Sequence, residues 1–157
     1  MALKGDRWEF QTDISWFMNT AQERGVITFA SSTTSGSGLA MDQGRAVVSS
    51  PLNPSGLKPV GLLLNDVVDK DLTRMHLNQH KDEVQKGSKV RLLMKGHVVT
   101  NMVVGTPTAL SIAYASTSGY LTSTSLGVVA TPPVGQFKST IDEDGYAKVE
   151  ITLPYNS

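Results

Sequence analysis

From Lys89 onward, short apolar runs alternate with turn signals, and this alternation constrains the fold more than any other feature of the sequence. Such runs, rich in β-branched and aromatic residues and bounded by Gly, Pro, Asn or Asp, are typical of strands. Hairpin turns are predicted at Lys95-Gly96, at Thr117-Ser118-Gly119 and within IDEDG, because each lies between two such runs. Several short strands at this spacing predict an all-β fold, as a small sandwich, barrel or jelly roll.

The part of the chain before Lys89 continues the β pattern less regularly. VITFASS and RAVVSS each predict a strand, and the apolar run PVGLLLNDVV predicts a buried one. A segment near residues 32–44 is rich in Gly and Ser and lacks periodicity, which indicates a flexible loop. With 157 residues the chain can bury one core but is too short for two ordinary domains. We therefore expect a single β domain over residues 26–157.

Residues 1–25 differ from the rest because they hold both tryptophans and two of the four phenylalanines. Read as a helix, the segment could be capped by Asp13 and ended by Gly25, with an apolar stripe that includes Met18. Read as a strand, the segment would have a solvent-facing side that is only partly polar. We expect an N-terminal arm, residues 1–25, that could include a short helix and whose aromatic side chains need a partner surface.

Charge and composition exclude several classes of partner. Lys plus Arg and Asp plus Glu both number 14, and no basic run is present, so binding to nucleic acid or to an anionic membrane is disfavoured. No segment approaches the roughly 18 apolar residues of a membrane span, and the start of the chain lacks the apolar run of a secretory signal. The absence of cysteine fits folding in a reducing cytoplasm.

The stretch TRMHLNQHKDEVQKG raises the question of a metal site, because His76 and His80 lie four residues apart. On a helix the two imidazoles could share one zinc ion, but Leu77 stands where a zinc hydrolase would carry its glutamate. On a strand the two side chains would lie roughly 13 Å apart, too far for one ion. We interpret both histidines as surface or interface groups, and we expect no metal and no cofactor.

No motif in the sequence indicates an enzyme. The Asp142–Gly145 stretch superficially resembles the start of a calcium loop, but strands flank it, so a hairpin turn that uses Asp-Gly is the better interpretation. The chain has neither a G-x-S-x-G elbow nor a Gly-rich phosphate loop before a helix. We therefore expect a protein without catalytic activity.

Longer stretches of the sequence carry a resemblance to a known family. The most specific are DLTR-x-H-x-x-x-HKDEVQ and the later DEDGYAKV, and a looser one begins at GTPTALSIAYAS. Together with ALKGDRWEFQTDISWFMN they resemble the small head decoration, or cement, proteins of tailed bacteriophages. The similarity covers nearly the whole chain outside the Gly/Ser loop. Two positions depart from the family pattern: Leu110-Ser111-Ile112 replaces a Gly-Asp turn, and His97 stands in place of an aromatic residue.

The resemblance implies a structural protein of the virion that binds the outside of the phage capsid and stabilises it by bridging capsomers. Its implied partner is the major capsid protein, and it implies a homo-oligomer, with a trimer favoured over a dimer. Large aromatic side chains are enriched among interface hot spots. The residues expected at a capsid or subunit interface are Arg7, Trp8, Phe10, Trp16, Phe17, Met18, His76 and His80.

Two other functions fit an all-β chain with exposed aromatic residues. A β-sandwich carbohydrate-binding or adhesion module could stack sugars on Trp8, Trp16, Tyr120 or Tyr155. A head-completion or tail component would share the β architecture, and its copy number per virion would distinguish it from a decoration protein.

Overall fold

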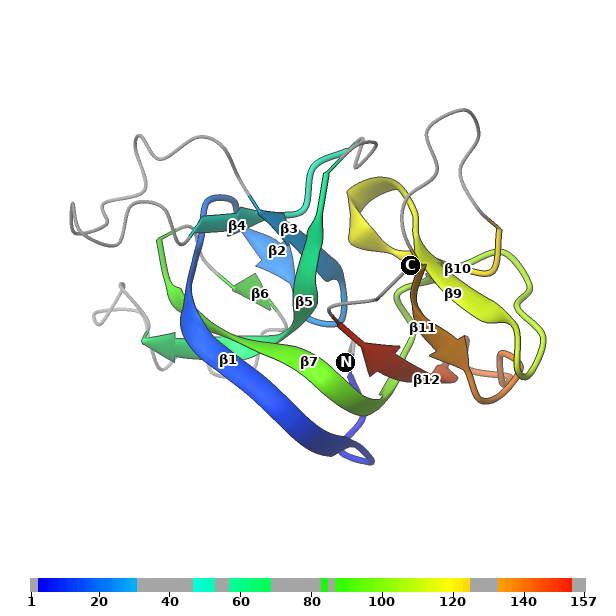
Figure 1. Ribbon diagram of the computed structural model, residues 1–157. Coiled ribbons are helices and arrows are strands. Elements are labelled where there is room, and N and C mark those ends of the chain that lie inside the picture. Colours follow the sequence, from blue (N-terminus) through cyan, green and yellow to red (C-terminus); the bar gives the residue numbers. More distant parts are fainter. Residues whose placement is uncertain are drawn as a thin grey trace.

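The computed structural model describes residues 3–30, 47–52, 57–68, 83–84, 87–124 and 133–153 and is nearly all β (Figure 1). One large sheet has the strand order β1-β4-β3-β5-β7-β12-β11-β9-β10-β8, and β2 pairs with β6 in a small second sheet. The strands are β1 (Trp8–Met18), β2 (Gln22–Glu23), β3 (Ile27–Ala30), β4 (Val47–Ser49), β5 (Pro59–Val68), β6 (Glu83–Val84), β7 (Lys89–Thr100), β8 (Val103–Val104), β9 (Ile112–Ala115), β10 (Leu121–Thr122), β11 (Pro133–Phe137) and β12 (Ala147–Thr152).

Strand β7 joins the two halves of the large sheet. Along one edge it pairs with β1, and along the other it pairs first with β5 and then, from Lys95 onward, with β12. Because β1 also pairs with β4, the strands β1, β4, β3, β5 and β7 close into a ring. The remaining strands extend from β12 on the other side of the molecule (Figure 1). The predicted all-β class is confirmed, with a small barrel and an open sheet that share one strand.

Two hydrophobic clusters lie on opposite faces of strands β5 and β7. Leu63 of β5 belongs to the cluster inside the ring, which we call the inner cluster and which also contains Met18 and Leu92. Its neighbours Leu62 and Leu64 belong to the other cluster, between the ring and the strands β9 to β12. Strand β5 is thus buried on both faces at Leu62–Leu64, which explains the apolar run at this part of the strand.

Most strands and turns predicted from the sequence are confirmed. VITFASS, RAVVSS and PVGLLLNDVV contain β3, β4 and β5, and the turn at Thr117–Gly119 joins the antiparallel pair β9 and β10. The turn within IDEDG joins the antiparallel pair β11 and β12. The predicted Gly/Ser loop near residues 32–44 lies outside the described residues.

The predicted hairpin at Lys95-Gly96 is wrong, because β7 runs through both residues without turning. Gly96 has a φ of +152°, and a Cβ atom there would lie 2.1 Å from the carbonyl oxygen of Trp8. This glycine therefore allows β1 to approach β7 closely. A glycine between two apolar runs gives the same sequence signal whether it turns the chain or admits a neighbouring backbone.

The predicted short helix in residues 1–25 is also wrong, because Trp8–Met18 forms β1. Pairing with β7 outweighs the helical spacing of the apolar residues, as tertiary context commonly does. A bulge between Asp13 and Trp16 changes which side chains point inward, so that Ile14 is exposed while Met18 is buried. Residues 1–25 therefore contribute a strand to the same sheet as the rest of the chain.

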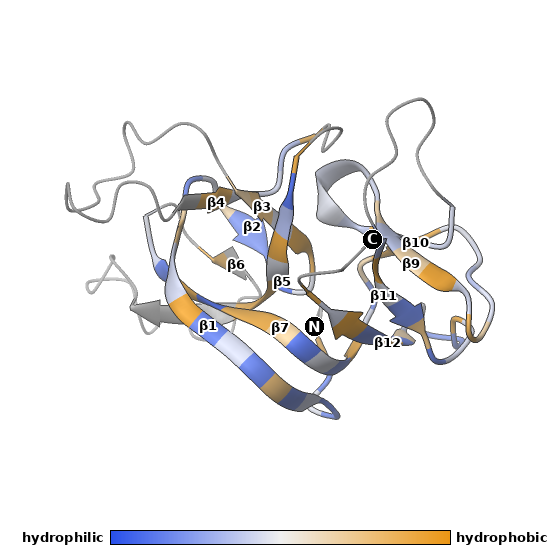
Figure 2. Ribbon diagram, in the orientation of Figure 1, coloured by the Kyte–Doolittle hydropathy of each residue, from blue (hydrophilic) through white to orange (hydrophobic). Residues whose placement is uncertain are grey.

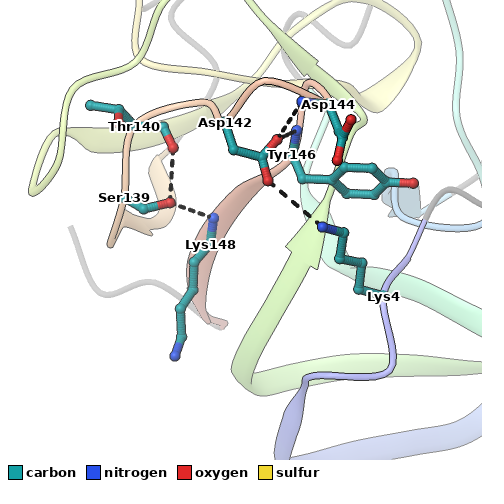
Figure 3. A network of polar contacts seen from close by, with 7 residues as sticks. All are labelled: Lys4, Ser139, Thr140, Asp142, Asp144, Tyr146 and Lys148. Carbon is teal, nitrogen blue, oxygen red and sulfur yellow. Dashed lines mark hydrogen bonds and ion pairs between the residues drawn. The ribbon is translucent and has the colours of Figure 1, made fainter.

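A polar network fastens the start of the chain to the turn between β11 and β12 (Figure 3). The Asp142 carboxylate accepts hydrogen bonds from the backbone N–H groups of Asp144, at 3.0 Å, and Tyr146, at 2.8 Å. Lys4 Nζ lies 3.7 Å from the same carboxylate and 4.4 Å from the centre of the Tyr146 ring. These contacts, led by the Tyr146 N–H, hold the pKa of Asp142 below its usual value.

Gly96→Ala is expected to destabilise the protein because the new methyl group would strain the backbone and collide with β1. Strain plus overpacking should lower the free energy of unfolding by roughly 2 to 5 kcal/mol. The matched control is Gly105→Ala, where φ is +83° but a Cβ atom would meet no other atom within 4 Å, so only backbone strain applies. Chemical denaturation of both variants measures the difference, and equal losses would contradict the close approach of β1.

Deletion of residues 2–24 is expected to abolish the cooperative thermal melt. The deletion removes β1 from the ring, takes Met18 out of the inner cluster and leaves one edge of β7 without its partner. Circular dichroism during heating measures the transition. A cooperative melt of the truncated chain would instead support an independently folded body over residues 26–157.

Asp142→Asn is expected to change how stability depends on acid. Since the pKa of Asp142 in the folded chain lies below its ordinary value of 3.8, the ionised carboxylate adds stability above that pH. This contribution is lost as the pH falls through the folded pKa. Wild type should melt at a higher temperature than the variant at pH 7, and the two melting temperatures should converge in strong acid. A difference that stays constant with pH would contradict the role of the charge.

Candidate functional site

Two large aromatic side chains are exposed at the start of β1. Trp8 is 61% exposed and Phe10 is 70% exposed, although both belong to a strand that is hydrogen-bonded along β7. Their ring centres lie 5.9 Å apart in an edge-to-face arrangement. Bands of apolar and polar residues alternate along β1 in Figure 2, as expected for a strand with two different faces. The sheet therefore displays these two rings on a rigid support.

Trp8 begins a row of side chains that crosses five strands of the sheet. The strand register places the members directly opposite one another on successive strands, so they share one outward face. The Trp8 ring packs on the His97 imidazole with their centres 5.5 Å apart. The row, which we call the cross-strand row, consists of Trp8 (β1), His97 (β7), Glu150 (β12), Gln136 (β11) and Ile112 (β9).

Two of the open hollows along the cross-strand row have a volume of about 310 Å³ each. One lies at the aromatic end, where Trp8 and Phe10 form part of its wall. The other lies at the opposite end and is lined in part by Gln136 and Ile112. Glu150 and Thr152 line both hollows, so the two adjoin on the same face.

The centre of the row is polar and its charges are paired. Lys138 Nζ lies 2.9 Å from a Glu150 carboxylate oxygen and donates a 2.7 Å hydrogen bond to the Gln136 side-chain oxygen. The hydrogen bond from Lys138, helped by the charges of Lys138 and His97, holds the pKa of Glu150 below its usual value despite partial burial. The carboxylate is therefore ionised at neutral pH. Exposed aromatic rings beside paired polar groups are typical of a surface that binds another protein.

No group of three or more His, Asp or Glu side chains among the described residues could hold a metal ion. Among the described residues there is no helix long and apolar enough to cross a membrane.

Three of the expected interface residues lie together at the aromatic end of β1. Arg7 is half-buried and its guanidinium lies 2.9 Å from the Glu9 carboxylate, which is also paired with Arg91. Glu9 lies between Trp8 and Phe10 in the chain, and its ion pair with Arg91 joins β1 to β7.

Three other expected interface residues lie at the far end of β1, toward the core. Trp16 is half-buried against the inner cluster, Phe17 is half-buried with Lys89 Nζ 5.9 Å from its ring centre, and Met18 is fully buried. The Trp16 indole donates a 3.1 Å hydrogen bond to Asp13. Burial raises the pKa of Asp13, but hydrogen bonds from Ser15 and Trp16 outweigh it and lower the pKa overall. His76 and His80 lie outside the described residues.

Sequence reasoning missed the rest of the cross-strand row. His97, Glu150 and Ile112 are far apart in the chain, and only the pairing order of their strands brings them together. Period-two alternation within β7 and β12 could have placed His97 and Glu150 on outward faces. It could not have shown that the two residues are neighbours.

The sugar-binding alternative gains little from this geometry. The planes of Trp8 and Phe10 are inclined at 65°, so the pair does not form one flat stacking platform. Trp16 and Tyr120 are half-buried and pack against the inner cluster, and Tyr155 lies outside the described residues.

Comparison with known families gives a match over most of the chain. Residues 13–152 match the family described as structural cement protein (E217 gp24/Pam3 gp6). The matched range begins within β1, after Trp8 and Phe10, and ends with the last residue of β12. No curated protein is similar enough in sequence to count as a relative. The resemblance found in the sequence is confirmed, and the chain belongs to the structural cement proteins of bacteriophages, which are virion proteins that stabilise the capsid.

Proposed function

We propose that the aromatic end of the cross-strand row attaches this cement protein to the outer surface of the capsid, on the major capsid protein. The observation that carries the proposal is the exposure of Trp8 and Phe10, at 61% and 70%, on a strand that is fixed by its pairing with β7. In a free protein such side chains leave a large apolar area in water. A partner surface that covers them removes this cost.

The energetics of binding favour this end of the molecule. A large aromatic side chain can bury on the order of 150 to 250 Å², and such residues dominate interface hot spots. Because β1 is already ordered by its ladder to β7, little backbone entropy is lost when a partner binds. Arg7 lines a further hollow together with Trp8 and can form part of the polar rim that surrounds an apolar contact.

We further infer that the protein lies on the capsid exterior and bridges neighbouring capsomers. A formal net charge of zero suits contact with capsid proteins and gives no electrostatic attraction to packaged DNA. Bridging would raise the overall affinity even where each contact is weak. Once one contact has formed, the next forms at a high effective concentration. We also predict a homo-oligomer, with a trimer favoured over a dimer. The mass of the protein in solution tests this prediction.

Trp8→Ala is expected to weaken attachment to capsid shells without changing the thermal melt of the free protein. Loss of a hot-spot anchor commonly costs about 2 kcal/mol, and about 1.4 kcal/mol is tenfold in affinity, so at least tenfold weaker binding is expected. The melt should not move, because the side chain is exposed in the free protein. Cosedimentation of the purified protein with undecorated shells measures binding.

The matched control is Trp16→Ala, on the same strand. Trp16 packs against the inner cluster, so its loss should lower the melting temperature while the folded fraction binds shells normally. The opposite pattern, with normal binding by Trp8→Ala and weak binding by folded Trp16→Ala, would move the attachment surface to the other end of β1. Normal binding by both variants would reject β1 as the attachment surface.

A further inference from the structure

Leu110 has a backbone conformation that a leucine rarely adopts. Its φ is +68°, in the left-handed region, where the Cβ atom of an L residue crowds the backbone. It is the third residue of the turn Thr108–Ser111, which the Ser111 N–H closes with a 3.1 Å hydrogen bond to the Thr108 oxygen. A positive φ at this position of a turn normally selects glycine or asparagine. A large apolar residue here costs stability that a glycine would not cost.

The surrounding hydrogen bonds hold Leu110 in this conformation. Its N–H donates to the Phe137 oxygen at 2.8 Å, and its own oxygen accepts from the Gln136 side chain at 3.0 Å. The next residue is also fixed, because the Phe137 N–H donates to the Ser111 oxygen at 2.8 Å. The turn is therefore anchored to β11 on both sides of the strained residue.

The strain does not serve packing within the protein. The Leu110 side chain is 67% exposed and is absent from both hydrophobic clusters. A conformation that costs stability and leaves a leucine in water is the kind of outlier that points to a function for the side chain.

Leu110 lies at the end of the cross-strand row opposite to Trp8. Its backbone is bonded to Gln136, and Ile112, which ends the row, is 46% exposed. Four steps between neighbouring strands separate Ile112 from Trp8, which is on the order of 19 Å across the sheet. Between the two apolar ends lie the paired charges of Glu150 and Lys138.

We propose that Leu110 and Ile112 form a second capsid contact, which binds an apolar depression on the major capsid protein of a neighbouring capsomer. This inference rests on the proposed function, because it takes the aromatic end of the row as the first contact. Two small apolar ends separated by a charged centre fit two separate contacts on one continuous shell. They do not fit one large apolar interface between two copies of the chain, which would bury the centre as well.

The test is Leu110→Gly, because it removes the side chain and the strain together. The free protein should melt at the same temperature or higher, while the apparent affinity for assembled shells should fall by about tenfold, the loss of a modest hot spot. Leu110→Met keeps a long apolar side chain and should bind close to wild type. The control is Leu52→Ser, since Leu52 is an even more exposed leucine, at 80%, that follows β4 and is not part of the row. It should bind normally.

Binding to isolated capsomers separates the second contact from the first. Trp8→Ala should weaken binding to isolated capsomers and to shells, whereas Leu110→Gly should weaken binding to shells alone. If Leu110→Gly binds shells as wild type does while Trp8→Ala does not, the second contact is wrong and the proposed function stands. If both variants bind normally, the proposed function fails and the second contact fails with it. A changed mass of free Leu110→Gly would assign the leucine to a contact between copies and overturn the proposal.

Discussion

The pairing of β1 with β7 is the interaction on which the rest of the structure depends. It closes the ring of five strands, and it brings Met18 into the inner cluster. It also fixes Trp8 above His97, at the start of the cross-strand row. The pairing depends in turn on Gly96, because any side chain there would meet the backbone of β1. A single position without a Cβ atom therefore links the closure of the barrel to the placement of the exposed aromatic rings.

The two hydrophobic clusters are coupled through strands that both of them share. Leu62 and Leu63 are adjacent on β5 but pack into different clusters, and Leu92 and Leu93 repeat this arrangement on β7. Neither strand can leave one cluster without also leaving the other. The ring and the open sheet should therefore unfold together in one cooperative transition, as is usual for single domains of this size.

Much of the fold could be predicted from the sequence, because strand patterns and turn residues are local signals. The runs around β3, β5 and β12 and the turn at Asp142–Gly145 were readable in this way. The role of Gly96 was not, since it depends on a strand almost ninety residues earlier in the chain. The aromatic residues of the candidate site could be found from their unusual concentration near the start of the chain. Their division into exposed Trp8 and half-buried Trp16 could not, because a bulge in β1 decides it.

The direction of the cross-strand row has a mechanical consequence. The row runs at right angles to the strands, so a pull between its two ends would pass through successive strand ladders in series. Strands β7 and β12 share six paired residues, whereas β11 has three with β12 and three with β9. Each ladder would carry the same tension from an expanding shell, so the two short ladders of β11 would separate first. The Lys138–Glu150 ion pair spans one of these two short ladders, as a side-chain tie beside the backbone bonds.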